Sequence, residues 1–251
     1  MLPNDVLNLL REIAPEETAM VGDPVGLLVA GEHSVIDTVG VCLDCTPTAA
    51  LRAVEQDVQI IVAHHPLLYH PLKRIVPDTD PVSRAVVTLI KADISLYAMH
   101  TNWDRANGGI NDTLAETLEL NTIRPFADGL PRIGDLPAPR PFADFAHFVG
   151  AALDCAGTSA LRINAIAPDT LISRVAVCGG AGASYLSAAI AAGAEAFVTS
   201  DVRHHEFIEA TGLGFALLDA GHDATETPGM RVLARLLGER LPGVTVVWLG
   251  E

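Results

Sequence analysis

Short apolar runs rich in β-branched residues alternate with alanine-rich stretches from residue 36 onward. The runs have the length of buried strands, and the stretches between them have the length of short helices. Alternating strands and helices are typical of βα units, in which a crossover helix joins two parallel strands. The sequence therefore predicts an α/β fold.

The positions of the elements follow from this alternation. Strands are predicted at Ile36–Asp44, Val58–Ala63, Ile94–His100, Arg174–Cys178, Ala196–Ser200, Phe215–Asp219 and Val244–Leu249, with another near Ala160–Ala165. Helices are predicted near 47–56, 81–92, 111–120, 183–192, 203–211 and 227–241, with another at Pro141–Cys155. The first helix has a clear start, because Thr46 offers a capping hydroxyl and Pro47 suits the first helical position.

Residues 125–142 interrupt the pattern. They include five prolines and two glycines, enough to stop a helix and to mark either a connection or a short edge strand. A chain of 251 residues can form one large domain or two compact ones. We therefore expect two α/β domains, residues 1–125 and 126–251, with mostly parallel sheets flanked by helices.

The charge of the chain limits its partners. Asp and Glu number 31 against 16 Lys and Arg, a net charge of −15. This field repels phosphate backbones, so duplex nucleic acid is not an expected partner, although bound metal ions could still hold an anionic small molecule. Four scattered cysteines favour a reducing, cytoplasmic setting. The N-terminus lacks signal-peptide features and no apolar run is long enough to span a membrane.

Histidines and acidic residues gather directly after the predicted strands. The clusters are His64-His65-Pro66, His100-Thr-Asn-Trp-Asp104, Asp201-Val-Arg-His204-His205 and His222-Asp-Ala-Thr-Glu226. Open α/β sheets bind their ligands beyond the carboxyl ends of the strands. These clusters are therefore the predicted functional site.

The residue types in these clusters indicate a site that binds metal ions. Imidazole and carboxylate are ligands for divalent Zn, Mn, Fe, Co or Ni, whereas a structural zinc site would use thiolates, and the clusters contain no cysteine. If the side chains converge and both carboxylates bridge, they supply about seven bonds to two ions roughly 3.5–4 Å apart, leaving positions for water or substrate. The side chains in question are His64, His65, Asp104, His222 and Glu226.

These four ordered motifs resemble those of the Nif-three-like dinuclear metal centre family, the GTP cyclohydrolase 1 type 2 homologues. The resemblance runs from Val25 to the C-terminal end. It implies a two-domain α/β subunit, two divalent ions in the cleft between the domains, and a toroidal homohexamer. Position by position, the implied metal ligands are His64, His65, Asp104, His222 and Glu226. The resemblance places His100 and Asp201 beside them as orienting or proton-transfer groups.

Four positions depart from the family pattern. Where the family commonly has Trp-Asp-Asn-x-Gly-Leu, this chain has Gly-Asp-Pro-Val-Gly-Leu at residues 22–27. Ser200 replaces a glycine before Asp201, and Thr225 replaces a serine before Glu226. None of these changes removes an implied ligand.

Other features allow two interpretations. Cys42 and Cys45 have redox-motif spacing, but residues three apart in a strand face opposite ways, which favours two buried small residues. The glycine-rich segment from Cys178 to Gly182 could cradle an anion, but it lacks a complete phosphate-binding motif, which favours a tight turn. Asp44 either faces the site or caps the next helix, and Trp103 either stacks on a base or packs in the core.

The leading functional hypothesis is a dinuclear metal-dependent hydrolase of the GTP cyclohydrolase type, acting on a small molecule such as a purine nucleotide. Hydroxide from the ions would attack C8 of the guanine ring. The predicted catalytic residues are His100, as proton shuttle, and Glu226. A metal-dependent phosphoesterase acting on nucleotides, and a non-catalytic metal-binding or assembly protein, are the alternatives, since a fold alone does not define a function.

Overall fold

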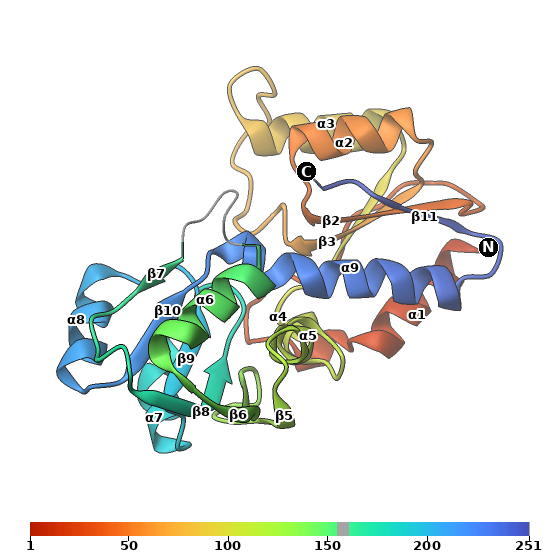
Figure 1. The fold of residues 1–251 in the computed structure, drawn as a ribbon. Helices are drawn as coiled ribbons and strands as arrows, with labels where there is room; N and C mark the ends of the chain where they lie inside the picture. The colour runs from red at the N-terminus through yellow and green to blue at the C-terminus, as the bar shows by residue number, and fades with distance from the viewer. Residues whose placement is uncertain (155–160, 251) are drawn as a thin grey trace. The chain divides into compact units, whose positions relative to one another are not determined.

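The computed structural model describes residues 1–154 and 161–250 (Figure 1). Its internal contacts divide the chain into two compact units, one formed by Met1–Ala106 with Met230–Glu251 and the other by Asn107–Gly229. This division differs from the predicted boundary at residue 125 because Asn121–Pro125 pairs within the second sheet and Thr245–Trp248 pairs within the first.

The first unit contains a five-stranded sheet in the order β1-β4-β3-β2-β11. Its strands are β1 (Gly26–Val29), β2 (Thr38–Asp44), β3 (Ile60–His65), β4 (Ser95–Ala98) and β11 (Thr245–Trp248). Strands β4, β3, β2 and β11 are parallel, and β1 runs antiparallel to β4. The expectation of a mostly parallel sheet is therefore confirmed for this unit.

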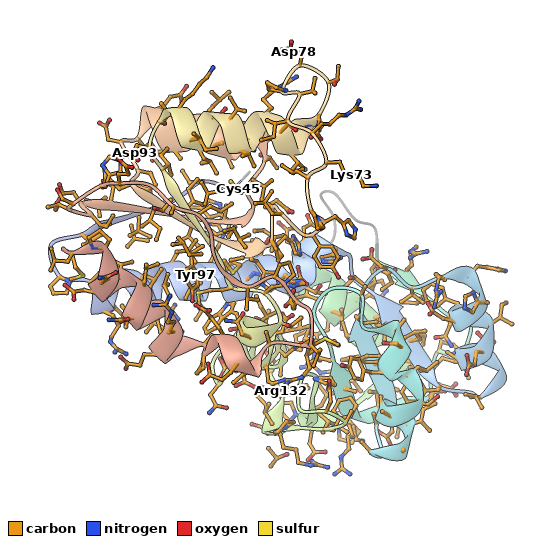
Figure 2. All side chains as sticks on the ribbon, turned by 180° about the vertical axis from the view of Figure 1, so that it is seen from behind. Cys45, Lys73, Asp78, Asp93, Tyr97 and Arg132 are labelled. Carbon is orange, nitrogen blue, oxygen red and sulfur yellow. The ribbon has the colours of Figure 1, made fainter. Side chains whose placement is uncertain are left out.

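Helices flank this sheet. They are α1 (Pro3–Ile13), the 3-10 turn η1 (Glu16–Thr18), α2 (Pro47–Glu55), α3 (Pro81–Lys91), α4 (Thr101–Arg105) and the later part of α9 (His222–Arg240). Figure 1 shows α2 and α3 side by side on one face of the sheet. The loop between β3 and α3 points its exposed Lys73 and Asp78 outward (Figure 2).

Helices α2 and α3 begin in the same way, with a capping side chain followed by a proline. The Thr46 hydroxyl accepts a hydrogen bond from the Ala49 amide at 3.1 Å, and the Asp80 carboxylate accepts one from the Ser83 amide at 3.0 Å. A proline occupies the first helical position in both cases, where its missing N–H costs little. The start predicted for α2 is confirmed.

The second unit contains a six-stranded sheet in the order β5-β6-β8-β9-β10-β7. Its strands are β5 (Asn121–Pro125), β6 (Arg132–Pro141), β7 (Arg162–Ile163), β8 (Leu171–Val177), β9 (Ala196–Thr199) and β10 (Ala216–Asp219). Strands β8, β9 and β10 are parallel, while β5, β6 and β7 join by antiparallel pairing. This sheet is mixed and not mostly parallel.

The helices of the second unit pack on two apolar clusters that include both faces of its sheet. They are α5 (Ile110–Thr117), α6 (Phe142–Ala152), η2 (Ala183–Tyr185), α7 (Leu186–Ala191), α8 (His204–Gly212) and the first part of α9. One cluster includes Phe145 of α6 with Val175 and Val177 of β8. The other includes Leu186 of α7 with Ala176 of the same strand, as the alternation of side chains in a strand requires. The predicted positions Cys155 and Ala160 lie outside the described residues.

The structure of the proline-rich segment, residues 125–142, differs from the predicted connection or short edge strand. It contains β6, a strand between β5 and β8, and not a connection or an edge strand. The pairing of β6 with β8 is irregular between Asp135 and Arg140, and Pro137 and Pro139 lie in this irregular part. A proline cannot donate to a sheet ladder and is tolerated where the ladder is interrupted.

Each predicted group of site residues lies where a strand ends. His64 and His65 are the last residues of β3, and His100 lies two residues beyond β4. Asp201 follows β9, and His222 follows β10. Within residues 1–154 and 161–250, no helix combines the length and the apolar character needed to cross a membrane.

Replacing Thr46 by Ala should lower the free energy of unfolding by about 1 kcal/mol, because the Ala49 amide loses its capping partner. Urea denaturation of both proteins measures the change. The control is Thr48→Ala, an exposed threonine in the first turn of the same helix. Equal midpoints for the two variants would contradict the capping role.

Cys42 and Cys45 are both buried in the core of the first unit, which confirms the structural interpretation over the redox motif. Burial and the nearby Asp44 carboxylate raise the pKa of the Cys45 thiol to about 12. About one thiol in ten thousand is then ionised at pH 8. Both cysteines should resist Ellman's reagent in the native protein and react on unfolding in guanidinium, and rapid native labelling would contradict this burial.

Candidate metal centre

His64 is the most deeply buried histidine of the first unit. Its ring has no exposed surface, and Nδ1 lies 2.7 Å from the carbonyl oxygen of Met99. A carbonyl only accepts, so Nδ1 bears the hydrogen of the neutral ring and Nε2 bears the lone pair. Nε2 lies 3.5 Å from Oδ1 of Asp104 on α4.

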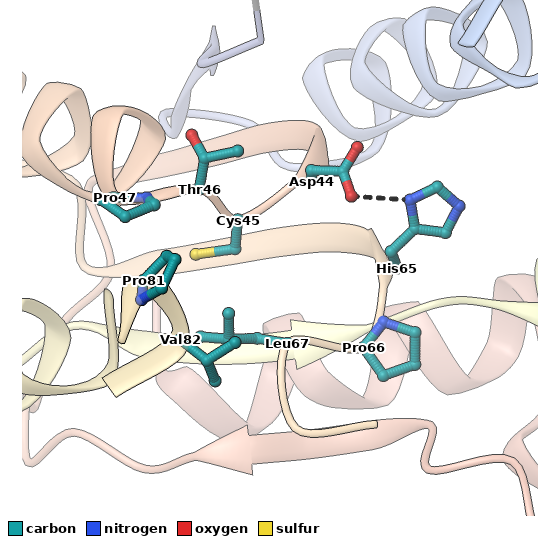
Figure 3. A pocket seen from close by; sticks show the side chains of 9 residues that line it. All are labelled: Asp44, Cys45, Thr46, Pro47, His65, Pro66, Leu67, Pro81 and Val82. Carbon is teal, nitrogen blue, oxygen red and sulfur yellow. Dashed lines mark hydrogen bonds and ion pairs between the residues drawn. The ribbon is translucent and has the colours of Figure 1, made fainter. Parts of the chain in front are cut away.

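His65 is held by a carboxylate from the neighbouring strand. Asp44 ends β2 and pairs in register with His65, and its Oδ1 lies 2.8 Å from His65 Nδ1 (Figure 3). Asp44 therefore faces the candidate site, and the capping role belongs to Thr46. The parallel register of β2 and β3 places these two residues side by side.

His100 is held by Asp23, a residue for which the sequence alone predicts no role. Asp23 Oδ1 lies 2.7 Å from His100 Nδ1, and Oδ2 accepts hydrogen bonds from the amide and the hydroxyl of Thr101. Burial opposes ionisation of Asp23, but these hydrogen bonds outweigh it and lower the pKa of the carboxyl. The sequence contains one signal for Asp23. It matches the aspartate of the family motif, although its two neighbours, Gly22 and Pro24, depart from that motif.

The three rings form one cluster. The ring centres of His64 and His65 are 5.0 Å apart, those of His64 and His100 are 5.2 Å apart, and those of His65 and His100 are 5.8 Å apart. One nitrogen from each ring lies within 4.8 Å of the others, so the cluster could hold a metal ion.

The second unit contributes a histidine and carboxylate group of its own. His222 Nδ1 lies 2.6 Å from Asp201 Oδ2, and His222 Nε2 lies 3.1 Å from Oε2 of Glu226. The helix predicted from residue 227 begins at His222 and includes Pro228. His222 and Glu226 therefore lie one turn apart on one face of α9, as residues four apart in a helix do.

The glycine-rich segment packs against this group as a tight turn. The amides of Gly179, Gly180 and Gly182 donate to side chains of Asn111, Thr225 and Thr199. These amides are therefore committed within the protein, which favours the tight turn over the anion cradle. Gly180 has φ +62°, and a Cβ there would collide with Glu226 Oε1 and lie 3.1 Å from His222 Nε2.

All four imidazoles of these groups are held in the same way. Nδ1 of His64 faces a carbonyl, and Nδ1 of His65, His100 and His222 faces a carboxylate. Such partners orient metal-ligating histidines and leave Nε2 to coordinate. The Nε2 to carboxylate distances of 3.5 and 3.1 Å are close to the spacing of about 3.0–3.4 Å expected for two ligands of one ion at normal bond lengths. The donor groups of both units therefore fit a divalent metal.

Other predicted residues have different surroundings. His204 and His205 are exposed at the start of α8, and among the described residues neither belongs to a group that could hold a metal. Trp103 is 1% exposed, so it packs in the interior and its ring face is not open to a base.

Fold and donor groups together define the class of this protein, an α/β protein of two units with histidine and carboxylate groups that could bind metal. A model of the family Duf34/NIF3 (NGG1p interacting factor 3) matches residues 1–249. The chain belongs to this family.

Similar proteins support the assignment. The chain is 35% identical to a GTP cyclohydrolase 1 type 2 homolog of Streptomyces coelicolor, over 94% of this chain and 85% of the relative. It is 31% identical to a protein of the same name from Clostridium perfringens, over 95% of this chain and 92% of the relative. A solved Bacillus cereus protein related to NIF3 has the same fold, with a TM-score of 0.89, 23% identity and coverage of 98% and 96%.

Replacing Gly180 by Ala should displace the Glu226 carboxylate, because the new methyl group would occupy its space. We expect a loss of about 1–3 kcal/mol of stability from the collision and weaker zinc binding. The matched control is Gly214→Ala, because Gly214 has φ +65° and a Cβ there would meet no other atom within 4 Å. Unfolding curves and competition with a zinc-binding dye measure both effects, and equal behaviour of the two variants would contradict this role of Gly180.

Proposed function

We propose that the protein is a dinuclear metal-dependent hydrolase of the GTP cyclohydrolase type. The observation that supports it most is the shared restraint of four imidazoles at Nδ1, which leaves Nε2 of His64, His65 and His222 to coordinate metal and Nε2 of His100 to transfer a proton. In this proposal the chain binds two divalent ions. The proposed ligands are His64, His65, Asp104, His222 and Glu226.

The bound ions would supply hydroxide at neutral pH by lowering the pKa of a water ligand from about 15.7 to about 7. The residues of the chain supply position and proton transfer. Asp44 and Asp201 orient the rings of His65 and His222. Asp23 holds Nδ1 of His100, so Nε2 of His100 would exchange the proton with the reacting ring. Asp104 and Glu226 would supply the negative charge that balances the ions.

The names of the relatives favour ring opening of a purine nucleotide as the reaction, with the C8 carbon of guanine released as formate. Phosphoester hydrolysis by the same ions would release phosphate instead, and a protein that only stores metal would release neither product. The proposal also includes assembly of six copies, which native mass spectrometry tests.

Glu226→Gln should lower the metal content from about two ions per chain and abolish formate release from GTP, because an anionic ligand is replaced by a neutral amide of the same shape. Elemental mass spectrometry on protein purified without chelator or nickel resin measures the metal, and a coupled formate assay measures turnover. The control is Glu209→Gln, because Glu209 is exposed on α8.

The outcomes of this experiment separate the hypotheses. Two ions retained by Glu226→Gln would overturn the ligand assignment. Phosphate without formate from the wild-type protein would identify a phosphoesterase. Two ions in the wild-type protein, with no product from GTP, would overturn the proposed cyclohydrolase activity but would still support the proposed metal site.

A further inference from the structure

A pocket of about 270 Å³ opens beside His65 within the first unit (Figure 3). Asp44 and His65, which form one hydrogen-bonded pair of the candidate metal centre, lie at one end of it. Leu67 and Val82 lie on its other side, and the sulfur of Cys45 points toward Pro81 (Figure 3). The pocket is therefore continuous with the side chains proposed to hold metal.

The lining of the pocket does not suit phosphate. Among the described residues that line it there is no lysine or arginine, and Asp44 would repel an anion. The starts of α2 and α3 reach the pocket at Pro47 and Pro81, which have no N–H to donate. One amide further along each helix, that of Ala49 in α2 and that of Ser83 in α3, donates to its own cap.

The same lining suits a flat, neutral ring. Prolines, Leu67 and Val82 offer apolar walls, while Asp44 and the Thr46 hydroxyl offer oxygen atoms that accept hydrogen bonds. Pockets for whole drug-sized ligands have volumes of about 300–1,000 Å³. A volume of about 270 Å³ therefore matches one heterocyclic ring system and not a complete nucleotide.

We infer that this pocket binds the heterocyclic ring of the substrate and places the edge of that ring at the metal-holding end of the site. The phosphates of a nucleotide then lie outside the pocket. The inference rests on the proposed hydrolase function for the identity of the ring, which is a guanine-type purine whose N–H donors face the Thr46 hydroxyl and whose opposite edge, at C8, faces the metal-holding end.

Guanosine, which has the ring and no phosphate, tests the inference by calorimetric titration of the zinc-loaded protein. Val82→Phe should weaken guanosine binding about tenfold or more, because the larger side chain fills space that the ring needs. Val87→Phe is the matched control, since Val87 is a half-buried valine of the same helix that does not line the pocket. Zinc content should stay unchanged in both variants.

A second matched pair guards against misfolding of the Val82 variant. Leu67 and Leu68 both pack against the core of the first unit, but only Leu67 lines the pocket among the described residues. Leu67→Phe should weaken guanosine binding, and Leu68→Phe should not. Far-ultraviolet circular dichroism confirms that each variant is folded.

The results separate a failure of the proposed ring pocket from a failure of the proposed hydrolase reaction. Guanosine binding that Val82→Phe and Leu67→Phe weaken supports the inference, even if the wild-type protein releases no formate from GTP. Equal binding by pocket and control variants, or no guanosine binding by the wild-type protein at millimolar concentration, overturns it even if formate is released.

Discussion

The hydrogen bond at Nδ1 of each site histidine is the interaction on which the candidate site depends. A neutral imidazole can present either nitrogen, and a carbonyl or carboxylate at Nδ1 selects one tautomer and fixes the plane of the ring. Met99 does this for His64 through its backbone, while Asp44, Asp23 and Asp201 do it for the other rings. These partners come from different strands and loops, so the fold of each unit sets the direction of its ligand atoms.

Some of the carboxylates that make the chain acidic accept these hydrogen bonds. Three of the acidic residues bind histidine rings and are not simply part of an acidic surface. They are Asp44, Asp23 and Asp201, and each has an oxygen within 2.8 Å of an imidazole nitrogen. A carboxylate in this position makes the ring a stronger donor to a cation. An acidic chain can therefore concentrate cations at one place while it repels polyanions elsewhere.

The sequence predicted the α/β fold and most strands of both units, because buried strands and amphipathic helices leave a clear periodic signal. It did not predict β6, since five prolines in a segment normally exclude an interior strand and only the irregular pairing with β8 explains their tolerance. The sequence predicted His64, His65 and His222 as metal ligands from their places after strands, and the structure places each of them in a group of side chains that could hold a metal ion. The sequence could not predict that Asp23 contacts His100, because the two residues are 77 positions apart.

The order of segments along the chain has a consequence for folding during synthesis. The second unit is one continuous stretch, whereas the first sheet receives its edge strand β11 only from residues 245–248. Until these residues leave the ribosome, β2 has an open edge, and open edges invite pairing with other chains. The second unit can therefore fold early, while the first must keep an incomplete sheet until residues 245–248 have been synthesised, and a chaperone that covers strand edges would help most before that point.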